Sequence, residues 1–164
     1  MTTQPPQPGR WAQGEHEIDG MLERGELEYV TPSHDHAALL MDQAEAHLGS
    51  AQPLVETDPP SAFTLLYDGA RKALTALLAV QGLRPTRAGG HVAVQQAAEA
   101  QLGPNTKHLV RAFGGLRRRR NESEYPSPED PPVTVEEARD GLDDARSIVE
   151  VAQRLLPHLG PFRR

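Results

Sequence analysis

The chain contains no cysteine among its 164 residues. It therefore has no disulfide framework, no thiolate metal site and no cysteine nucleophile, which fits a reducing compartment. The first residues also lack the basic region and apolar core of a signal peptide. No apolar run approaches the roughly 20 residues that a membrane span needs. We therefore expect a cytoplasmic protein.

Familiar catalytic and metal-binding motifs are missing as well. His34 and His36 are two residues apart, so on a helix they point to different faces, and no H-E-x-x-H spacing exists. Gly89 and Gly90 have no Lys-Ser or Lys-Thr after them, which argues against a P-loop. No Gly-x-Ser-x-Gly elbow occurs either. We expect neither a metal ion nor a cofactor.

Length and charge limit the architecture and the partners. A chain of 164 residues suits one domain that buries roughly 70% of its unfolded surface. The formal net charge of -6 argues against broad electrostatic attraction to nucleic acid. Four consecutive arginines, Arg117 to Arg120, nevertheless place a basic cluster on this acidic chain.

Composition and periodicity divide the chain into four segments. Residues 1–14 are rich in Pro, Gln and Gly and are predicted to be a disordered tail. Residues 15–30 are predicted to form a short amphipathic helix that packs on the outside of the body. Residues 31–158 form the helical body, and residues 159–164 are a C-terminal tail.

The first half of the body predicts two long helices. Apolar residues recur every three or four positions from Ala37 to Val55, although Pro53 should kink or end that helix. The second helix follows Asp58 and ends at Gly82. Because its apolar face is the widest, it should lie deepest in the fold. Residues 83–90 are predicted to be a loop.

The second half predicts a shorter helix and two further long ones. The shorter helix ends at Gly103 and Pro104, and the third long helix starts near Asn105. Thr134 and Glu137 form a capping-box signature for the fourth. No part of the body alternates like a strand, and no repeated unit indicates a solenoid. We therefore predict an all-α, antiparallel four-helix bundle, with an extra short N-terminal helix and a short helix between the second and third long helices.

Arg120 is the most informative residue of the basic cluster. Leu109, Phe113 and Leu116 form an apolar stripe on the third long helix, and Arg120 is the next position on it. An arginine on an apolar face is costly unless a carboxylate, hydroxyl or ligand pairs with it. We therefore expect Arg120 to contact an acceptor in the fold or in a dimer cleft.

The neighbouring arginines point to the other faces of the same helix. We expect Arg118 and Arg119 to be substantially more exposed than Arg120. On the second long helix, Tyr67 borders the apolar stripe, and Asp68 could meet a basic group from a neighbouring helix. Two interpretations stay open at this point: a structural polar contact inside the bundle, or a ligand or catalytic pocket centred on Arg120.

Several of these features together resemble a known family. They are the Tyr67-Asp68-x-Ala70-Arg71-Lys72-Ala73-Leu74 helix, the Gly90-His91 turn, and Arg120-Asn121-x-x-x-Tyr125 followed by a long closing helix. Over about residues 34 to 156 the pattern resembles the HEPN superfamily of small helical bundles, bacterial type. The resemblance implies a homodimer in which two copies of the motif face each other across a cleft.

The resemblance also implies a chemistry. In many HEPN proteins an Arg, often followed by a polar residue such as Asn, precedes a His in a metal-independent ribonuclease site. Arg120 matches the Arg and Asn121 the polar residue, but Tyr125 stands where the His is expected. A phenol, with an ordinary pKa near 10, is a poor general base at neutral pH, yet it still donates a hydrogen bond and stacks on bases.

We therefore predict an interaction or nucleotide/RNA-binding module that acts as a homodimer. Arg117, Arg120, Asn121 and Tyr125 would bind the ligand, with Asp68 and Glu124 as orienting partners. The alternative is a toxin-like endoribonuclease in which Arg120, Asn121 and Tyr125 are catalytic, and a third reading is a non-catalytic scaffold. The family also implies a nucleotidyltransferase or an antitoxin as a partner, and no membrane partner is expected.

Overall fold

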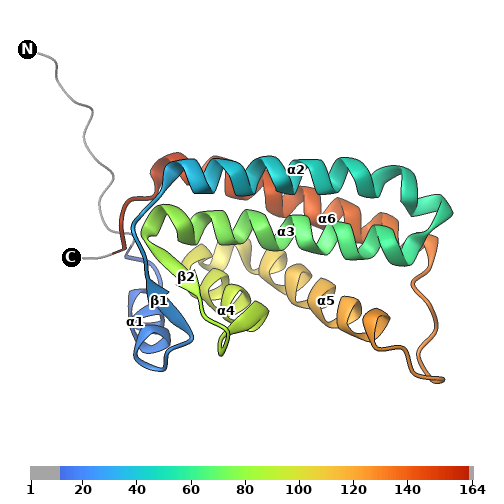
Figure 1. Cartoon of the computed structure of the whole chain (residues 1–164), viewed down its shortest axis with the longest axis horizontal. Helices are drawn as coiled ribbons and strands as arrows, with labels where there is room; N and C mark the ends of the chain where they lie inside the picture. The colour runs from blue at the N-terminus through green and yellow to red at the C-terminus, as the bar shows by residue number, and fades with distance from the viewer. Residues whose placement is uncertain (1–11, 163–164) are drawn as a thin grey trace, which may run out of the picture.

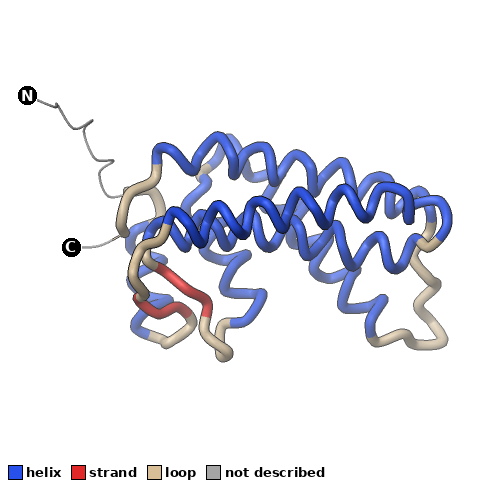
Figure 2. Tube along the Cα trace, turned by 45° about the horizontal axis from the view of Figure 1, so that its top comes forward, coloured by secondary structure: helices blue, strands red, loops and turns tan. Residues whose placement is uncertain are grey.

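The protein is a bundle of long helices with a small two-stranded sheet at one end (Figures 1 and 2). A computed structural model describes residues 12–162. The elements in chain order are α1 (Glu15–Glu23), β1 (Leu27–Tyr29), α2 (His34–Thr57), α3 (Pro59–Gln81), β2 (Leu83–Pro85), α4 (Gly90–Leu102), α5 (Lys107–Glu124) and α6 (Val135–Leu155), with short 3-10 turns at Pro104–Thr106 and Leu156–His158.

The four long helices α2, α3, α5 and α6 run up and down in turn, which confirms the predicted bundle (Figure 1). Helix α3 packs against α2, α6 and α5. It also has the most buried residues of any helix, so the prediction that it lies deepest is confirmed. The short helix α4 lies between α3 and α5 in sequence, as predicted, and packs against α5.

Local capping explains where these helices begin. The Ser33 hydroxyl accepts a hydrogen bond from the amide of His36, and an Asp58 carboxylate oxygen accepts one from the amide of Ser61. Thr134 and Glu137 form the complete capping box at the start of α6. Each of these side chains satisfies an amide that the first helical turn leaves unpaired.

The sheet corrects two predictions. The helix expected over residues 15–30 ends at Glu23, and Leu27–Tyr29 form β1. The loop expected over residues 83–90 begins with β2, which pairs antiparallel with β1. Gly25 takes a φ of 71°, which turns the chain out of α1. Because the two strands are far apart in sequence, the residues around each strand do not predict their pairing.

Pro53, which is expected to kink or end its helix, lies inside α2. Helix α2 does not end there but continues to Thr57. Proline removes one backbone donor, so the carbonyl of Gly49 loses its partner. Both residues are exposed, and water is available to that carbonyl.

The predicted tails are only partly described. Residues 1–11 and 163–164 lie outside the described residues. Of the predicted C-terminal tail, Leu159 and Phe162 are buried, and the amide of Phe162 donates to the carbonyl of Gln81. This segment is therefore packed against the body: Leu159 lies in the main core, and Phe162 lies in a small apolar cluster with α1, the sheet and α4. Within residues 12–162, no helix is long and apolar enough to cross a membrane.

Candidate anion-binding site

The stripe on α5 leads to Arg120 as predicted. Leu109, Phe113 and Leu116 are buried, and the Arg120 side chain is 22% exposed. One terminal nitrogen of its guanidinium lies 2.7 Å from Oε1 of Glu124, one helical turn later. Its Nε is buried and has no hydrogen-bond partner within the described residues. Arg120 therefore contacts an acceptor but keeps an unsatisfied donor.

Tyr67 on α3 lies beneath this guanidinium. Its side chain is almost completely buried, and its ring stacks on Phe113 with centroids 5.6 Å apart. Cζ of Arg120 lies 5.7 Å from the centroid of the Tyr67 ring, within the range of a cation–π interaction. The aromatic pair therefore gives Arg120 a rigid support from the core.

The hydroxyl of Tyr67 reaches His91 at the start of α4. The phenol oxygen lies 2.9 Å from Nδ1 of His91. Burial raises the pKa of Tyr67 to about 12, so the phenol stays protonated and has a hydrogen to donate. Where Nδ1 accepts that hydrogen, Nε2 of neutral His91 carries a proton and is a donor. We refer to Tyr67, His91, Arg120 and Glu124 together as the Arg120 site.

Positive charge dominates the surroundings of this site. Burial lowers the pKa of His91, and the charges of Arg71 and Arg120 lower it further. Nε of Arg117 donates to Oε1 of Gln95 on α4 at 2.9 Å, and Arg117 also acts electrostatically on Tyr67. Arginines from α3 and α5 thus converge on one phenol and one imidazole, an arrangement suited to an anion.

Asp68 meets a basic group from a neighbouring helix, as expected, but within the described residues that group is His47 and not Arg120. Its carboxylate contacts Arg71 on the same helix and lies 3.0 Å from Nε2 of His47 on α2. Burial by itself would raise the pKa of Asp68, but the hydrogen bond and charge of Arg71 lower it, and the net pKa is below the ordinary value. Asp68 holds Arg71 in place, and Glu124 is the carboxylate that contacts Arg120.

The remaining residues of the predicted motif lie at the surface. Asn121 is exposed, and Tyr125, which follows the last turn of α5, is 78% exposed. The amide of Tyr125 still donates to the carbonyl of Asn121, so helical geometry extends to this point. Both side chains are accessible to a ligand or to a second copy of the chain.

The exposure predicted for Arg119 is wrong, whereas Arg118 is exposed as expected. The Arg119 side chain is only 17% exposed, less than that of Arg120. It donates to both carboxylate oxygens of Glu137 and to the carbonyl of Pro131. The segment that joins α5 to α6 brings these acceptors to Arg119, and the helical spacing on α5 contains no sign of this.

Sequence reasoning also missed part of the site. The sequence places His91 only in the Gly90-His91 turn and does not indicate its hydrogen bond with the hydroxyl of Tyr67. Gln95, one turn later on α4, was not singled out although it positions Arg117. Within residues 12–162, no group of three or more histidine or carboxylate side chains is placed to hold a metal ion.

Comparison with known proteins identifies the fold family. A family model described as the HEPN domain matches residues 37–155, from the first turn of α2 to the last residue of α6. Neither the curated proteins nor the solved structures gave a match. The matched region covers more than half of the chain and contains the four long helices and the Arg120 site. The chain therefore belongs to the HEPN family.

Proposed function

We propose that this chain is a HEPN module that binds the phosphate groups of RNA or nucleotides at the Arg120 site, and that it is not an efficient ribonuclease. The observation that carries this proposal is the guanidinium of Arg120. Tyr67 and Glu124 fix it in place, while its Nε has no acceptor among residues 12–162. A buried unpaired donor costs about 1–3 kcal/mol. Such groups need an explanation, and a ligand that supplies the acceptor is one.

The surrounding residues support an anionic ligand. Arg71, Arg117 and Arg120 act together on Tyr67 and His91. Preorganised guanidinium groups are suited to phosphate because their donors match two oxygen atoms at once. Tyr125 and Asn121 lie exposed at the end of the same helix, where they can reach bases or riboses.

Binding is proposed over cleavage because the motif carries Tyr125 in place of its histidine. A phenol is a poor proton acceptor at neutral pH, so the expected general base is missing. The ribonuclease remains the second candidate because of one observation. His91 supplies an imidazole within hydrogen-bond distance of the Tyr67 hydroxyl, and its pKa lies below the ordinary value.

The binding experiment compares Arg120→Gln with Arg154→Gln, which removes an exposed arginine from α6. We expect wild-type protein to bind a fluorescent single-stranded RNA or AMP, measured by anisotropy and calorimetry. Arg120→Gln should weaken binding about ten- to a hundredfold, because a charge-assisted hydrogen bond contributes about 1.5–3 kcal/mol. Arg154→Gln should bind like the wild type. Equal losses in the two variants would contradict the proposal.

The cleavage experiment uses the same RNA with EDTA present. We expect little or no cleavage by the wild-type protein, and some gain for Tyr125→His if the motif geometry is otherwise suitable. Robust cleavage by the wild type that is lost in both Arg120→Ala and Tyr125→Phe would establish the ribonuclease. Cleavage lost in His91→Gln but retained in Tyr125→Phe would assign the imidazole role to His91.

A further inference from the structure

Helix α5 carries an unusual concentration of positive charge. From Lys107 to Asn121 it contains six lysines and arginines and no aspartate or glutamate, in a chain with a net charge of -6. Two of the six are neutralised by carboxylates: Arg119 pairs with Glu137 and Arg120 with Glu124. The remaining cations need a different explanation.

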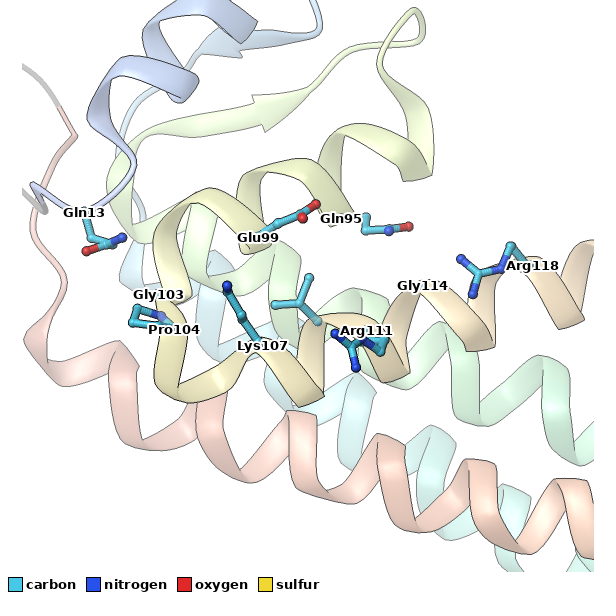
Figure 3. A pocket seen from close by; sticks show the side chains of 10 residues that line it. Gln13, Gln95, Glu99, Gly103, Pro104, Lys107, Arg111, Gly114 and Arg118 are labelled. Atoms are coloured by element: carbon cyan, nitrogen blue, oxygen red, sulfur yellow. The ribbon is translucent and has the colours of Figure 1, made fainter.

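Three of the remaining cations line one groove. Lys107, Arg111 and Arg118 face a groove of about 630 Å³ that lies between α4 and α5 (Figure 3). We call it the α4–α5 groove. Gln95 and Glu99 of α4 line the opposite side. Within residues 12–162, none of the three cations forms an ion pair with a carboxylate, Glu99 included.

The three cations form a continuous row. They are spaced by four and seven residues, so they share one face of α5. The eleven helical steps from Lys107 to Arg118 rise about 16 Å. Gly114 lies between Arg111 and Arg118 and leaves the groove open there. A Cβ at this position would come within 2.8 Å of Nε2 of Gln95.

The groove is connected to the Arg120 site. Gln95 lines the groove, and its Oε1 accepts the hydrogen bond from Nε of Arg117. Arg117 in turn acts on Tyr67 and His91. A ligand anchored at the Arg120 site and long enough to pass Arg117 would therefore run beside Lys107, Arg111 and Arg118.

The charges on α5 oppose the stability of the helix itself. Cations at a helix N-terminus and anions at its C-terminus are unfavourable to the helix dipole, each by about 0.3–1 kcal/mol. Helix α5 begins with Lys107 and ends with Glu124, and it has no acidic residue in its first turn and no basic residue in its last. Stabilisation of the helix therefore does not account for the row of cations.

We propose that the α4–α5 groove binds the sugar-phosphate backbone of single-stranded RNA whose end or one nucleotide occupies the Arg120 site. This inference rests on the proposed function and extends it from a phosphate to a strand. A row about 16 Å long suits successive phosphates rather than one mononucleotide. A protein partner would be expected to insert apolar anchors, but Val110 and Pro104 are the main apolar side chains of the groove.

The groove also predicts the kind of recognition. None of its lining residues is aromatic, so it offers no platform on which bases stack. Contacts from Lys and Arg to phosphate position a strand but carry no sequence information. Binding along the groove should therefore be tolerant of sequence, and any base preference should arise at the Arg120 site.

The test compares two double variants that remove the same charge. Lys107→Gln/Arg111→Gln changes the groove, and Arg146→Gln/Arg154→Gln changes two arginines of α6 outside it. Each is titrated with a labelled single-stranded RNA of about 12 nucleotides at several salt concentrations. The groove variant should reduce the slope of log K against log salt by about 1.4, since each single-strand phosphate contact contributes about 0.7.

Three further results are expected. The α6 variant should keep the wild-type slope, AMP should bind the groove variant as tightly as the wild type, and Arg118→Gln alone should reduce the slope by about 0.7. Circular dichroism and thermal melting establish that each variant is folded. The groove variant should melt no lower than the wild type, because Lys107 opposes the helix dipole.

The outcomes separate this inference from the proposed function. An unchanged slope in the groove variants, with RNA binding still lost in Arg120→Gln, would overturn the groove and leave the Arg120 site intact. Absence of RNA binding by the wild type would overturn both. Polyglutamate that competes as strongly as an RNA of similar charge would also overturn the RNA assignment, in favour of an acidic protein partner.

Discussion

At the scale of single residues, Tyr67 connects the hydrophobic core to the Arg120 site. Its ring stacks on Phe113, its face supports the guanidinium of Arg120, and its hydroxyl reaches His91. The three contacts come from α5 and α4, so one α3 side chain sets the relative positions of the cation and the imidazole. Any change at Tyr67 should therefore affect both.

His91 should titrate below its ordinary pKa of about 6.5. Burial disfavours the imidazolium, and Arg71 and Arg120 repel it. In an NMR titration we expect the midpoint of His91 to rise in Arg120→Ala, because one repulsive charge is removed. A midpoint that does not move would show that Arg120 does not face this imidazole.

The same shift makes stability depend on pH. As the pH falls, His91 is protonated in the unfolded chain before it is protonated in the folded chain. The contribution of neutral His91 to the free energy of unfolding is therefore fully present above about pH 6.5, and it is lost as the pH falls through the lower folded-state pKa. Denaturant unfolding of the wild type should show this loss. His91→Gln should reduce it, whereas His158→Gln, which changes a histidine exposed at the surface, should not.

At the scale of elements, close helix packing depends on small residues. Gly141 of α6 is buried against α3, and a Cβ there would lie 3.0 Å from Phe63 and 3.2 Å from Leu66. These side chains are themselves buried and have little room to move. Gly49 of α2 is also helical, but a Cβ there would meet nothing within 4 Å.

The two glycines should respond oppositely to alanine. Gly141→Ala should lower the free energy of unfolding by about 1–3 kcal/mol, because it overpacks the α3–α6 contact. Gly49→Ala should raise the free energy of unfolding by up to about 1 kcal/mol through helix propensity alone. Urea denaturation measures both. Stabilisation by Gly141→Ala would mean that α3 and α6 separate easily at this point.

At the scale of the whole molecule, an N-terminal extension is attached to the HEPN body. Helix α1 and strand β1, which precede the matched HEPN region, share a small apolar cluster with β2, α4 and Phe162, separate from the main core. The cluster lies at the end of the bundle where α2 begins and α3 ends, away from the segment between α5 and α6 (Figure 1). Because α4 carries His91 and Gln95, this extension supports the helix that completes the site.

We also predict a homodimer. The family resemblance implies that two motifs face each other, and a two-fold association is the commonest closed arrangement. Tyr125, at 78% exposure, is accessible for such a contact. Light scattering at micromolar concentrations should give twice the chain mass of 17.9 kDa. A monomer would leave each motif as half of a site and would favour the scaffold interpretation.

The helices could be predicted because their signals are local. Ser33, Asp58 and Thr134 mark the starts of α2, α3 and α6, and apolar residues at three- and four-residue spacing define their buried faces. The same spacing singled out Arg120, whose acceptor Glu124 is one turn away on the same helix. Capping and helix faces depend only on neighbours within a few residues.

Only the tertiary structure decided the contacts between distant segments. The pairing of β1 with β2, the hydrogen bond between Tyr67 and His91, and the ion pair between Arg119 and Glu137 all join different elements. Each depends on how the helices and connecting segments are placed, which the spacing of residues along one element does not encode. The sequence therefore determined the helical HEPN body and the position of Arg120 on the apolar face of α5. Tertiary packing determined that His91 and Gln95 of α4 lie beside the site and that Glu137 of α6 pairs with Arg119.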